Sequence, residues 1–397
     1  MVPAFEIREA AATRILALPD SLGWALNSLG IATALPQGEG LWSVSSVSKV
    51  GVVSVGEHEL YIKPKLPIAR LFFLMGYSRS PNYWRDSDVA LSANEQLVSS
   101  IVGSFIRQVK QATVQGLLQG YKTVHESEPM VRGKLNIPAQ IGRRAGLPLP
   151  AEVTYDDYTV DIAENRVLLA ASRKLLTVPR LAATDRQSLR KLALKFEGVA
   201  LTAGRTVSPP IRFTRLNAHY APAVVLAEII LKGGSLEQQV GTVTARSFLF
   251  DMWEVFEDFV SVALREAMAS HGGSVDLQYR GKHLDIGGVV PLRPDIVWRD
   301  DQEVLAVLDA KYKAEKNNRF PNADLYQMLA YCTRFNMRAG HLVYAKGECD
   351  ETFHDIRGAD VRLFTHSLDL EAQPNELLGQ IERLAAQVVE RSKVAPQ

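Results

Sequence analysis

The first ninety residues show a hydrophobic pattern typical of short β-strands separated by turns. Residues 41–55 are rich in valine and serine and partly alternate between apolar and polar positions. Residues 59–67 alternate again until prolines end the pattern, and the Gly56–Glu57 step before them is typical of a hairpin turn. We therefore predict a small β-rich N-terminal module over residues 1–90 that engages a partner.

From Ser92 the pattern changes to the helical period. Ser92 and Glu95 form a capping box, and apolar residues follow at helical spacing as far as Val114. The same period recurs in three further segments, residues 161–176, 184–196 and 217–231. Gly233-Gly234 then breaks the pattern, so we predict a mostly helical middle region over residues 91–240.

One segment of this region, residues 132–150, interrupts the helical period with glycines and prolines. It carries several basic residues, Arg132, Lys134, Arg143 and Arg144. Two interpretations are open: a solvated loop or hairpin, or a basic arm that touches a partner or a phosphate backbone.

The last part of the chain, residues 241–397, shows a different order of elements. Residues 251–270 form a strongly amphipathic helix. Three strand-like stretches follow, residues 275–279, 289–298 and 303–312, with Asp300-Asp301 as the turn between the last two. A second helix and a further strand come next, at residues 322–337 and 341–344. This order predicts a compact α/β core, and the whole chain is predicted to be a multidomain protein of the α+β or α/β class.

Composition and charge narrow the class of protein. The apolar fraction of 47% is that of a globular protein, and the formal net charge of +1 excludes a histone-like polycation but not a local basic surface. Two cysteines, Cys332 and Cys349, exclude a disulfide framework and a four-thiolate zinc site. The sequence shows neither a signal peptide nor a membrane-spanning stretch, so we expect a reduced, cytoplasmic protein without a membrane partner.

Two aspartates lie in two predicted strands that a tight turn joins. The sequence reads Pro294-Asp295 and, after the turn, Asp309-Ala310-Lys311. We expect Asp295 and Asp309 to meet at one edge of the sheet, where a hard cation such as Mg²⁺ relieves the repulsion between their carboxylates. Lys311 shares a strand face with Asp309 and can reach an attacking water or the oxygens of a phosphate. This set of groups indicates metal-assisted phosphodiester hydrolysis.

An acid-x-Lys pattern is short enough to occur by chance in a chain of this composition. Here it ends an apolar stretch, where a charge is costly unless it is solvated, paired or bound to metal. Glu257, at the margin of the apolar stripe of its helix, either points at the sheet edge or is a solvated glutamate. Gln327 and Tyr331 share a helix face, either as rim residues or as groups that position the site.

This order of residues resembles the PD-(D/E)xK nuclease superfamily and, more closely, the McrC family, the nuclease subunits of McrBC modification-dependent restriction systems. In the last domain, the segments that resemble this family are residues 252–260, 292–297 (LRPDIV), 307–313 (VLDAKYK) and 324–331. Similar segments upstream are residues 60–67, 131–135 (VRGKL) and 155–168. Trp253 departs from the small polar residue that is frequent at its position, which should affect only helix packing.

The resemblance implies an endonuclease active only with a partner, a hexameric McrB-like AAA+ GTPase that recognises modified cytosine. The substrate would be double-stranded, methylated DNA, and Mg²⁺ would be the cofactor, with Mn²⁺ as a substitute. Asp295, Asp309 and Glu257 would hold the metal together with the carbonyl of Ala310. Lys311 would help to position and deprotonate the attacking water, and Gln327 and Tyr331 would orient the site.

Further basic residues have open roles. Lys313 and Lys316 either contact the phosphate backbone or form a solvated basic loop. The arm at residues 132–150 is the best candidate for the segment that activates the partner. The sequence lacks the phosphate-binding pattern G-x-x-x-x-G-K-[ST], so we expect no nucleotide on this chain itself. The alternative function is an adaptor that activates an AAA+ NTPase and has weak or no nuclease activity.

Overall fold

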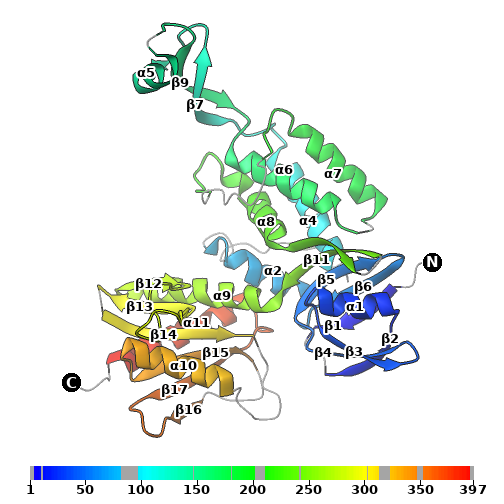
Figure 1. Ribbon diagram of the computed structural model, residues 1–397, viewed down its shortest axis with the longest axis vertical. Coiled ribbons are helices and arrows are strands. Elements are labelled where there is room, and N and C mark those ends of the chain that lie inside the picture. Colours follow the sequence, from blue (N-terminus) through cyan, green and yellow to red (C-terminus); the bar gives the residue numbers. More distant parts are fainter. Residues whose placement is uncertain are drawn as a thin grey trace. The chain divides into compact units, whose positions relative to one another are not determined.

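The computed structural model describes the chain in ten stretches. They are residues 4–9, 12–81, 97–145, 147–179, 181–201, 211–240, 243–301, 303–312, 322–346 and 352–393. The chain divides into two compact units, one made of residues 1–91 with 236–397 and the other of residues 92–235. Helices and strands are mixed in both units (Figure 1). None of the described helices is both long enough and apolar enough to cross a membrane.

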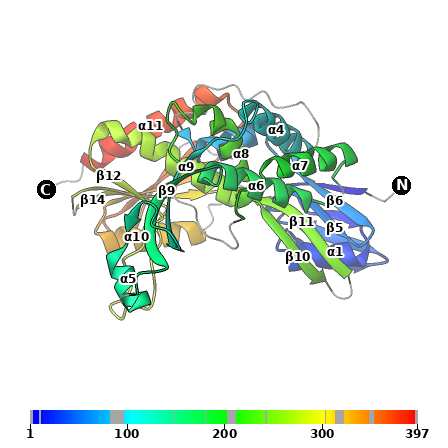
Figure 2. The same ribbon diagram turned by 90° about the horizontal axis from the view of Figure 1, so that it is seen from above.

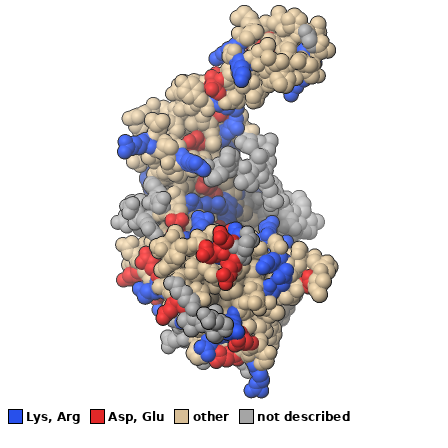
Figure 3. All heavy atoms as spheres, turned by 90° about the vertical axis from the view of Figure 1, so that its left-hand side faces the viewer, with Lys and Arg blue, Asp and Glu red and all other residues tan. Residues whose placement is uncertain are grey.

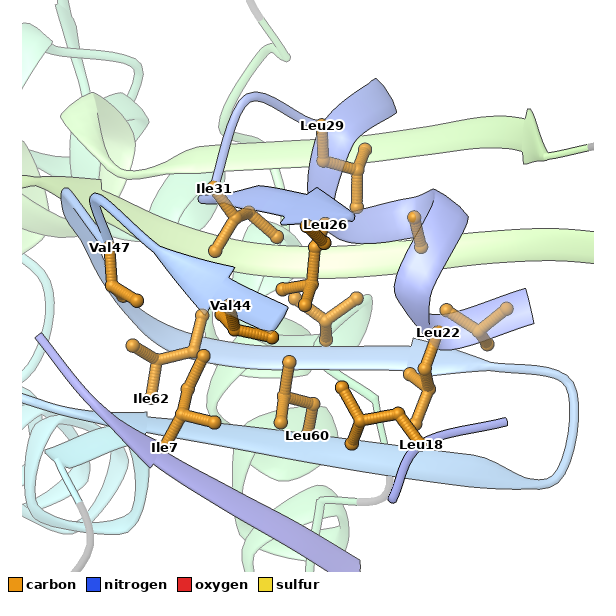
Figure 4. Close-up of a cluster of buried hydrophobic side chains, with 14 of the residues drawn as sticks. Ile7, Leu18, Leu22, Leu26, Leu29, Ile31, Val44, Val47, Leu60 and Ile62 are labelled. Carbon is orange, nitrogen blue, oxygen red and sulfur yellow. The ribbon is translucent and has the colours of Figure 1, made fainter. Parts of the chain in front are cut away.

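The N-terminal part of the first unit contains two sheets. In the described part of the chain, the larger sheet has the order β1-β6-β5-β11-β10 and the smaller one the order β2-β4-β3. The strands are β1 (Ala4–Arg8), β2 (Arg14–Ala17), β3 (Thr33–Gly38), β4 (Leu41–Ser45), β5 (Lys49–Val55), β6 (His58–Lys63), β10 (Gly234–Val240) and β11 (Val243–Asp251). Helix α1 (Asp20–Ser28) contributes Leu22 and Leu26 to the core that joins these elements (Figure 4).

Besides the strands expected of the β-rich module predicted for residues 1–90, this part of the chain contains the helices α1 and α2 (Ile68–Tyr77). Helix α2 is buried from Arg70 to Tyr77. A helix covered on nearly all sides needs no polar face, so its sequence shows no helical alternation.

The C-terminal part of the first unit is a mixed sheet covered by helices on both faces (Figures 1 and 2). Its order among the described residues is β12-β13-β14-β15-β17-β16. The strands are β12 (Ser274–Leu277), β13 (Ile296–Asp300), β14 (Glu303–Lys311), β15 (Ala339–Ala345), β16 (Thr352–Asp355) and β17 (Arg362–Leu368). Strands β12 to β14 are antiparallel, whereas β14, β15 and β17 are parallel. The covering helices are α9 (Met252–Met268) and α11 (Pro374–Lys393) on one side and α10 (Asn322–Phe335) on the other, with the short η2 (Ala269–His271) after α9.

The second unit combines a helical bundle with a narrow β-sheet. The helices are α4 (Leu97–Ala112), α6 (Ala163–Leu176), α7 (Ala183–Lys195) and α8 (Ala221–Lys232), preceded by η1 (Ala218–Tyr220). A three-stranded sheet of order β7-β9-β8 extends from this bundle and carries α5 (Ile137–Arg144) (Figure 1). Its strands are β7 (Gly120–Glu128), β8 (Lys134–Leu135) and β9 (Ala151–Thr159). From here on, the arm means residues 120–159, which include the basic segment 132–150.

Several predictions need correction. Residues 289–298 are not one strand, since β13 begins only at Ile296 and the residues before it form a loop. The segment 132–150 is not merely a loop or hairpin, since it contains β8 and α5. The predicted boundary near residue 240 falls between β10 and β11. Strand β11 therefore falls in the predicted last domain, although it pairs with β5 in the N-terminal sheet. The capping box at Ser92 and Glu95 lies outside the described residues.

Candidate active site

Strand register brings three polar side chains into a row across β12, β13 and β14. Ile296 pairs with Leu308 in the antiparallel β13–β14 ladder, so Asp295 and Asp309 are opposite each other one step further on. Ile296 also pairs with Leu277, and the N–H of the next residue, Gln278, donates to the carbonyl of Asp295 at 2.8 Å. The pairing of two hairpin strands therefore determines which groups meet.

Asp295 is at the centre of this row and has the most contacts. Its Oδ2 accepts a hydrogen bond from the N–H of Ala310 at 2.8 Å, and its Oδ1 accepts one from Nε2 of Gln278 at 3.2 Å. The carboxyl groups of Asp309 and Glu257 act on Asp295 through their negative charges. Three acidic groups that repel one another in this way are stabilised by a bound proton or by a cation.

The acidic groups are in an environment that disfavours negative charge. Asp295 and Asp309 are 6% and 2% exposed. Burial, followed by the charges of Asp309 and Glu257, raises the pKa of Asp295 to about 9. Burial also raises the pKa of Asp309, although Lys311 opposes the shift. A bound cation would offset this penalty, because its positive charge stabilises the ionised carboxylates that burial disfavours.

Lys311 is the cation that the structure places beside these groups. It lies two residues after Asp309 on β14 and forms an ion pair with Oδ2 of Asp309. Burial acts to lower its pKa, but Asp309, Asp295 and Asp324 outweigh burial, so the pKa of Lys311 is raised. The lysine is therefore protonated at neutral pH and can stabilise a negatively charged ligand.

Glu257 comes from the N-terminal half of α9 and is half-buried. Its carboxylate accepts a hydrogen bond from Nε2 of Gln278. Burial raises its pKa, while the hydrogen bonds with Asp295 and Gln278 lower it. The sequence left two interpretations of Glu257 open. In the structure its side chain points at the sheet edge, where it meets Gln278.

Gln327 and Tyr331 lie on α10, which packs on the sheet face that carries Asp309 and Lys311. Nε2 of Gln327 donates to the hydroxyl of Tyr331 at 2.7 Å. Tyr331 is 3% exposed, and burial together with the charges of Asp309 and Asp295 raises its pKa. The phenol therefore stays neutral and is part of the wall of the site.

Two residues of the site were missed by sequence reasoning. Gln278 has a left-handed backbone (φ +51°) at the end of β12 and bridges Glu257 and Asp295. Asp324, 5% exposed in the first turn of α10, contributes to the raised pKa of Lys311. No local pattern marks Gln278, whereas Asp324 could have been suspected as an acid next to the predicted Gln327. Lys313 and Lys316 lie outside the described residues.

The donor set suits a hard cation. Among the described residues, no three or more His, Cys, Asp and Glu side chains already surround one point as metal ligands. Mg²⁺ does not require such a cage, because it commonly binds one or two carboxylates and completes its shell with water and phosphate. Asp295, Asp309 and the carbonyl of Ala310 supply oxygen ligands of this kind, and the mutual repulsion of the buried acids favours a cation.

The basic residues of the arm are apart from this row in the chain and have their own partners. Arg143 and Arg144 form ion pairs with the buried Glu152 at 3.4 and 3.1 Å. The guanidinium of Arg132 lies over the ring of Tyr155, 4.4 Å from its centroid. Lys134 is exposed on β8. The side chain of Arg143 is 73% exposed and that of Arg144 34%, so Arg143 is the freer of the two to meet another molecule.

The arm also exposes an apolar surface. Its exposed apolar residues are Tyr121, Met130, Val131, Leu135, Ile137, Ile141, Leu147, Leu149 and Tyr158. Figure 3 shows the far end of the arm, at the top of the view, as mostly uncharged. Exposed apolar residues gathered on a small element are typical of a protein-binding surface.

Comparisons with known proteins agree over most of the chain. The family model described as "McrBC 5-methylcytosine restriction system component" matches residues 44–345. A chain of the Thermococcus gammatolerans assembly of McrB AAA+ hexamers with bound McrC has the same fold, with a TM-score of 0.56 and 18% identity, over 97% of this chain and 100% of that one. A chain of the cryo-EM structure of the Thermococcus gammatolerans McrBC complex matches 67% of this chain and 88% of its own length, with 20% identity and a TM-score of 0.38.

No curated protein matches the sequence. The family match covers the N-terminal sheets from β4 onward, the second unit, and the row of Gln278, Asp295 and Asp309. The chain therefore belongs to the family of McrBC 5-methylcytosine restriction system components.

Proposed function

We propose that this protein is an McrC-like endonuclease subunit that hydrolyses phosphodiester bonds of DNA with Mg²⁺. The observation that carries the proposal is the buried row of Asp295 and Asp309 with Lys311 on the neighbouring position of the same strand face. Buried acids of raised pKa beside a protonated lysine are costly for stability. Such an arrangement is typical of a reaction centre.

Each residue has a role that its contacts support. Asp295, Asp309 and the carbonyl of Ala310 would hold Mg²⁺, with Glu257 as a further ligand or as the holder of a water. The metal would supply a Lewis acid for the phosphate and lower the pKa of water. Lys311 would stabilise the charge that develops on the phosphate and help to orient the attacking water. Gln327 and Tyr331 would form the wall against which the phosphate is positioned.

We further propose that the chain works with an McrB-like AAA+ GTPase hexamer and acts on DNA that contains 5-methylcytosine. The family description names a 5-methylcytosine restriction system, and the structural neighbour of similar fold was solved with McrB hexamers. Cleavage would depend on that partner, which would supply nucleotide hydrolysis and recognition of the modified base. Mn²⁺ is expected to replace Mg²⁺ in cleavage.

The arm is the part that we propose to activate the partner. Its apolar surface favours a protein over a phosphate backbone, and the exposed cations Arg132, Lys134 and Arg143 can act on a nucleotide site at a neighbouring subunit. Arg144 would act mainly by its ion pair with Glu152.

The test separates cleavage from partner activation. Asp309→Ala should lower cleavage of methylated duplex DNA by about 10³-fold or more, because it removes a proposed metal ligand. Stimulation of the partner's GTP hydrolysis should remain. Asp300→Ala, at the exposed opposite end of β13, is the matched control and should retain both activities.

Two outcomes would contradict the proposal. If wild-type protein with its partner and Mg²⁺ does not cut the methylated duplex but stimulates GTP hydrolysis, the chain is an adaptor. If Asp309→Ala loses stimulation together with cleavage, the division of labour between the two units is wrong.

A further inference from the structure

A hairpin-like loop extends from the candidate active site, and the roles given above do not use it. Residues 279–293 lie between β12 and β13, and residues 282–284 pair with residues 290–292. Leu284 donates from its N–H to the carbonyl of Val290 at 2.8 Å, and Leu292 donates to that of Lys282 at 3.0 Å. We call residues 279–293 the β12–β13 hairpin.

The tip of this hairpin is apolar and exposed. Ile286 is 109% exposed and Val289 79%, whereas Leu292 at the base is buried. The carboxylate of Asp285 accepts hydrogen bonds from the N–H groups of Val289 and Val290, at 3.0 and 2.7 Å, which holds the turn in one shape. Two exposed branched side chains on an ordered turn gain hydrophobic free energy only when a partner covers them.

The stem is basic and is attached to α10. Nε of Arg334 donates to the carbonyl of His283 at 2.7 Å, and Nζ of Lys282 lies 4.7 Å from the centroid of the Phe335 ring. Arg280 and Arg293 are exposed on the stem. With Lys282, they give the hairpin three cations against the single carboxylate of Asp285.

The hairpin is next to the candidate active site. Its first residue follows Gln278 directly, and Arg293 precedes Asp295 by two residues. A phosphate bound at Asp295 is therefore close to the stem. The chain from Asp295 to Val289 spans at most about 20 Å even when fully extended. At 3.4 Å per base pair along one strand, the tip is within roughly six base pairs of that phosphate.

We propose that the β12–β13 hairpin is a DNA-binding element of this site, with Ile286 and Val289 as an apolar wedge that enters a base step and Arg280 and Arg293 as phosphate contacts. Apolar side chains that unstack a base step beside basic phosphate contacts are a known mode of DNA binding. The inference rests on the proposed nuclease function, since DNA is the partner that the adjacent acids and lysine would require.

The test uses the full chain with its partner and a 30-base-pair duplex that carries 2-aminopurine within six base pairs of the cut. Every protein carries Asp309→Ala, which blocks cleavage, so that Mg²⁺ and GTP can remain present. The chain with the unchanged hairpin should raise the 2-aminopurine fluorescence, which reports unstacking. Ile286→Ser/Val289→Ser should abolish this rise and weaken binding about tenfold, with unchanged melting temperature because both residues are exposed. Phe353→Ser, an exposed apolar residue on the opposite edge of the sheet, is the matched control.

The stem is tested by the salt dependence of the same binding. Arg280→Ala/Arg293→Ala should reduce the slope of log K against log salt by about 1.8, since each lost phosphate contact contributes about 0.9. Arg357→Ala, exposed after β16, should leave the slope unchanged.

The outcomes separate this inference from the proposed function. If the wild-type complex cuts DNA but the tip variant binds and unstacks it normally, the hairpin inference is wrong and the nuclease remains. If the tip variant instead loses stimulation of the partner's GTP hydrolysis with DNA binding intact, the hairpin is a protein interface and the inference is overturned. If the wild-type complex cuts no DNA, the proposed function fails, and the 2-aminopurine signal still decides whether the hairpin binds DNA.

Discussion

The row of acids in the six-stranded sheet and the arm of the second unit use charge in opposite ways. In the sheet, Asp295 and Asp309 are buried, close together and opposed by a lysine of their own strand. In the arm, Arg132 and Arg143 are exposed and the apolar side chains are exposed with them. Buried charge is expensive and is kept where it performs chemistry, whereas exposed apolar surface is expensive and is kept where it binds.

The two regions also differ in what holds them in place. The acids are positioned by strand register inside a sheet that helices cover on both faces, so a one-residue slip of β13 would turn Asp295 to the opposite face, away from Asp309. The arm is a narrow sheet in which the residues of β7 are mostly exposed, whereas those of β9 are mostly buried or half-buried. Its position relative to its own helical bundle depends on a few polar contacts at its base, among them those of Asp161.

After the loss of cleavage expected for Asp309→Ala, the largest effect is expected in the arm. Arg143→Glu should lower the partner's GTP hydrolysis on the order of tenfold, because it reverses an exposed charge at a binding surface. The Mg²⁺-dependent change in melting temperature should stay as in wild type. The matched control is Arg190→Glu on α7, which is also exposed. An unchanged hydrolysis rate would remove the arm from the activation step.

The next effect is at the base of the arm. Asp161 accepts hydrogen bonds from Arg166 on α6, Lys122 on β7 and the N–H of Ala200. Asp161→Asn should destabilise the second unit by about 2 kcal/mol, because it removes the charge from these bonds. Asp157→Asn, whose 3.8 Å pair with Arg132 is exposed, should cost much less. Equal losses from both, measured by urea unfolding, would contradict this account.

The carboxylate of Asp161 should also make the stability of the fold depend on pH. Arg166 first, then Lys122 and Ala200, hold the pKa of Asp161 well below its usual value. A lowered pKa means that its stabilising effect is complete above the unfolded-state pKa of about 4 and is lost as the pH falls below that value. Wild type should therefore lose more stability than Asp161→Asn between pH 5 and pH 2, and parallel curves would argue against the assignment.

A smaller effect tests the metal at the acids. With a dissociation constant near 1 mM, 10 mM MgCl₂ should raise the melting temperature by roughly 3 °C. The rise should vanish in Asp295→Ala/Asp309→Ala and be absent with NaCl of equal ionic strength. If wild type shows no rise even with duplex DNA present, the acids do not hold Mg²⁺ and do not form the proposed metal-dependent site.

The smallest expected effect concerns Glu257. Its pKa is raised in the folded protein, so its charge destabilises the fold at every pH above its unfolded-state value. Glu257→Gln should therefore raise the melting temperature of the metal-free protein at pH 7 by about 1 °C, with the gain fading as the pH approaches 4. A decrease at pH 7 would show that the carboxylate stabilises the metal-free site.

The sequence by itself was informative where neighbours in the chain are also neighbours in space. Alternation along one strand places Asp309 and Lys311 on one face, and a tight turn ending β13 at Asp300 brings Asp295 opposite Asp309. Helical spacing likewise pairs Gln327 with Tyr331, which are hydrogen-bonded. These relations depend on backbone geometry over a few residues, which a sequence pattern reports directly.

Only the tertiary structure decided the rest of the site. Gln278 reaches Glu257 and Asp295 for two reasons. Strand β12 pairs with β13 across a fifteen-residue hairpin, and Gln278, directly after β12, has a left-handed backbone. Asp324 approaches Lys311 because α10 packs on the face of β14 that carries it. Likewise, β11 joins the N-terminal sheet through β5, far from it in sequence. Such contacts form between elements that are distant in the chain, where hydrophobic packing and strand pairing, not local preference, determine which groups meet.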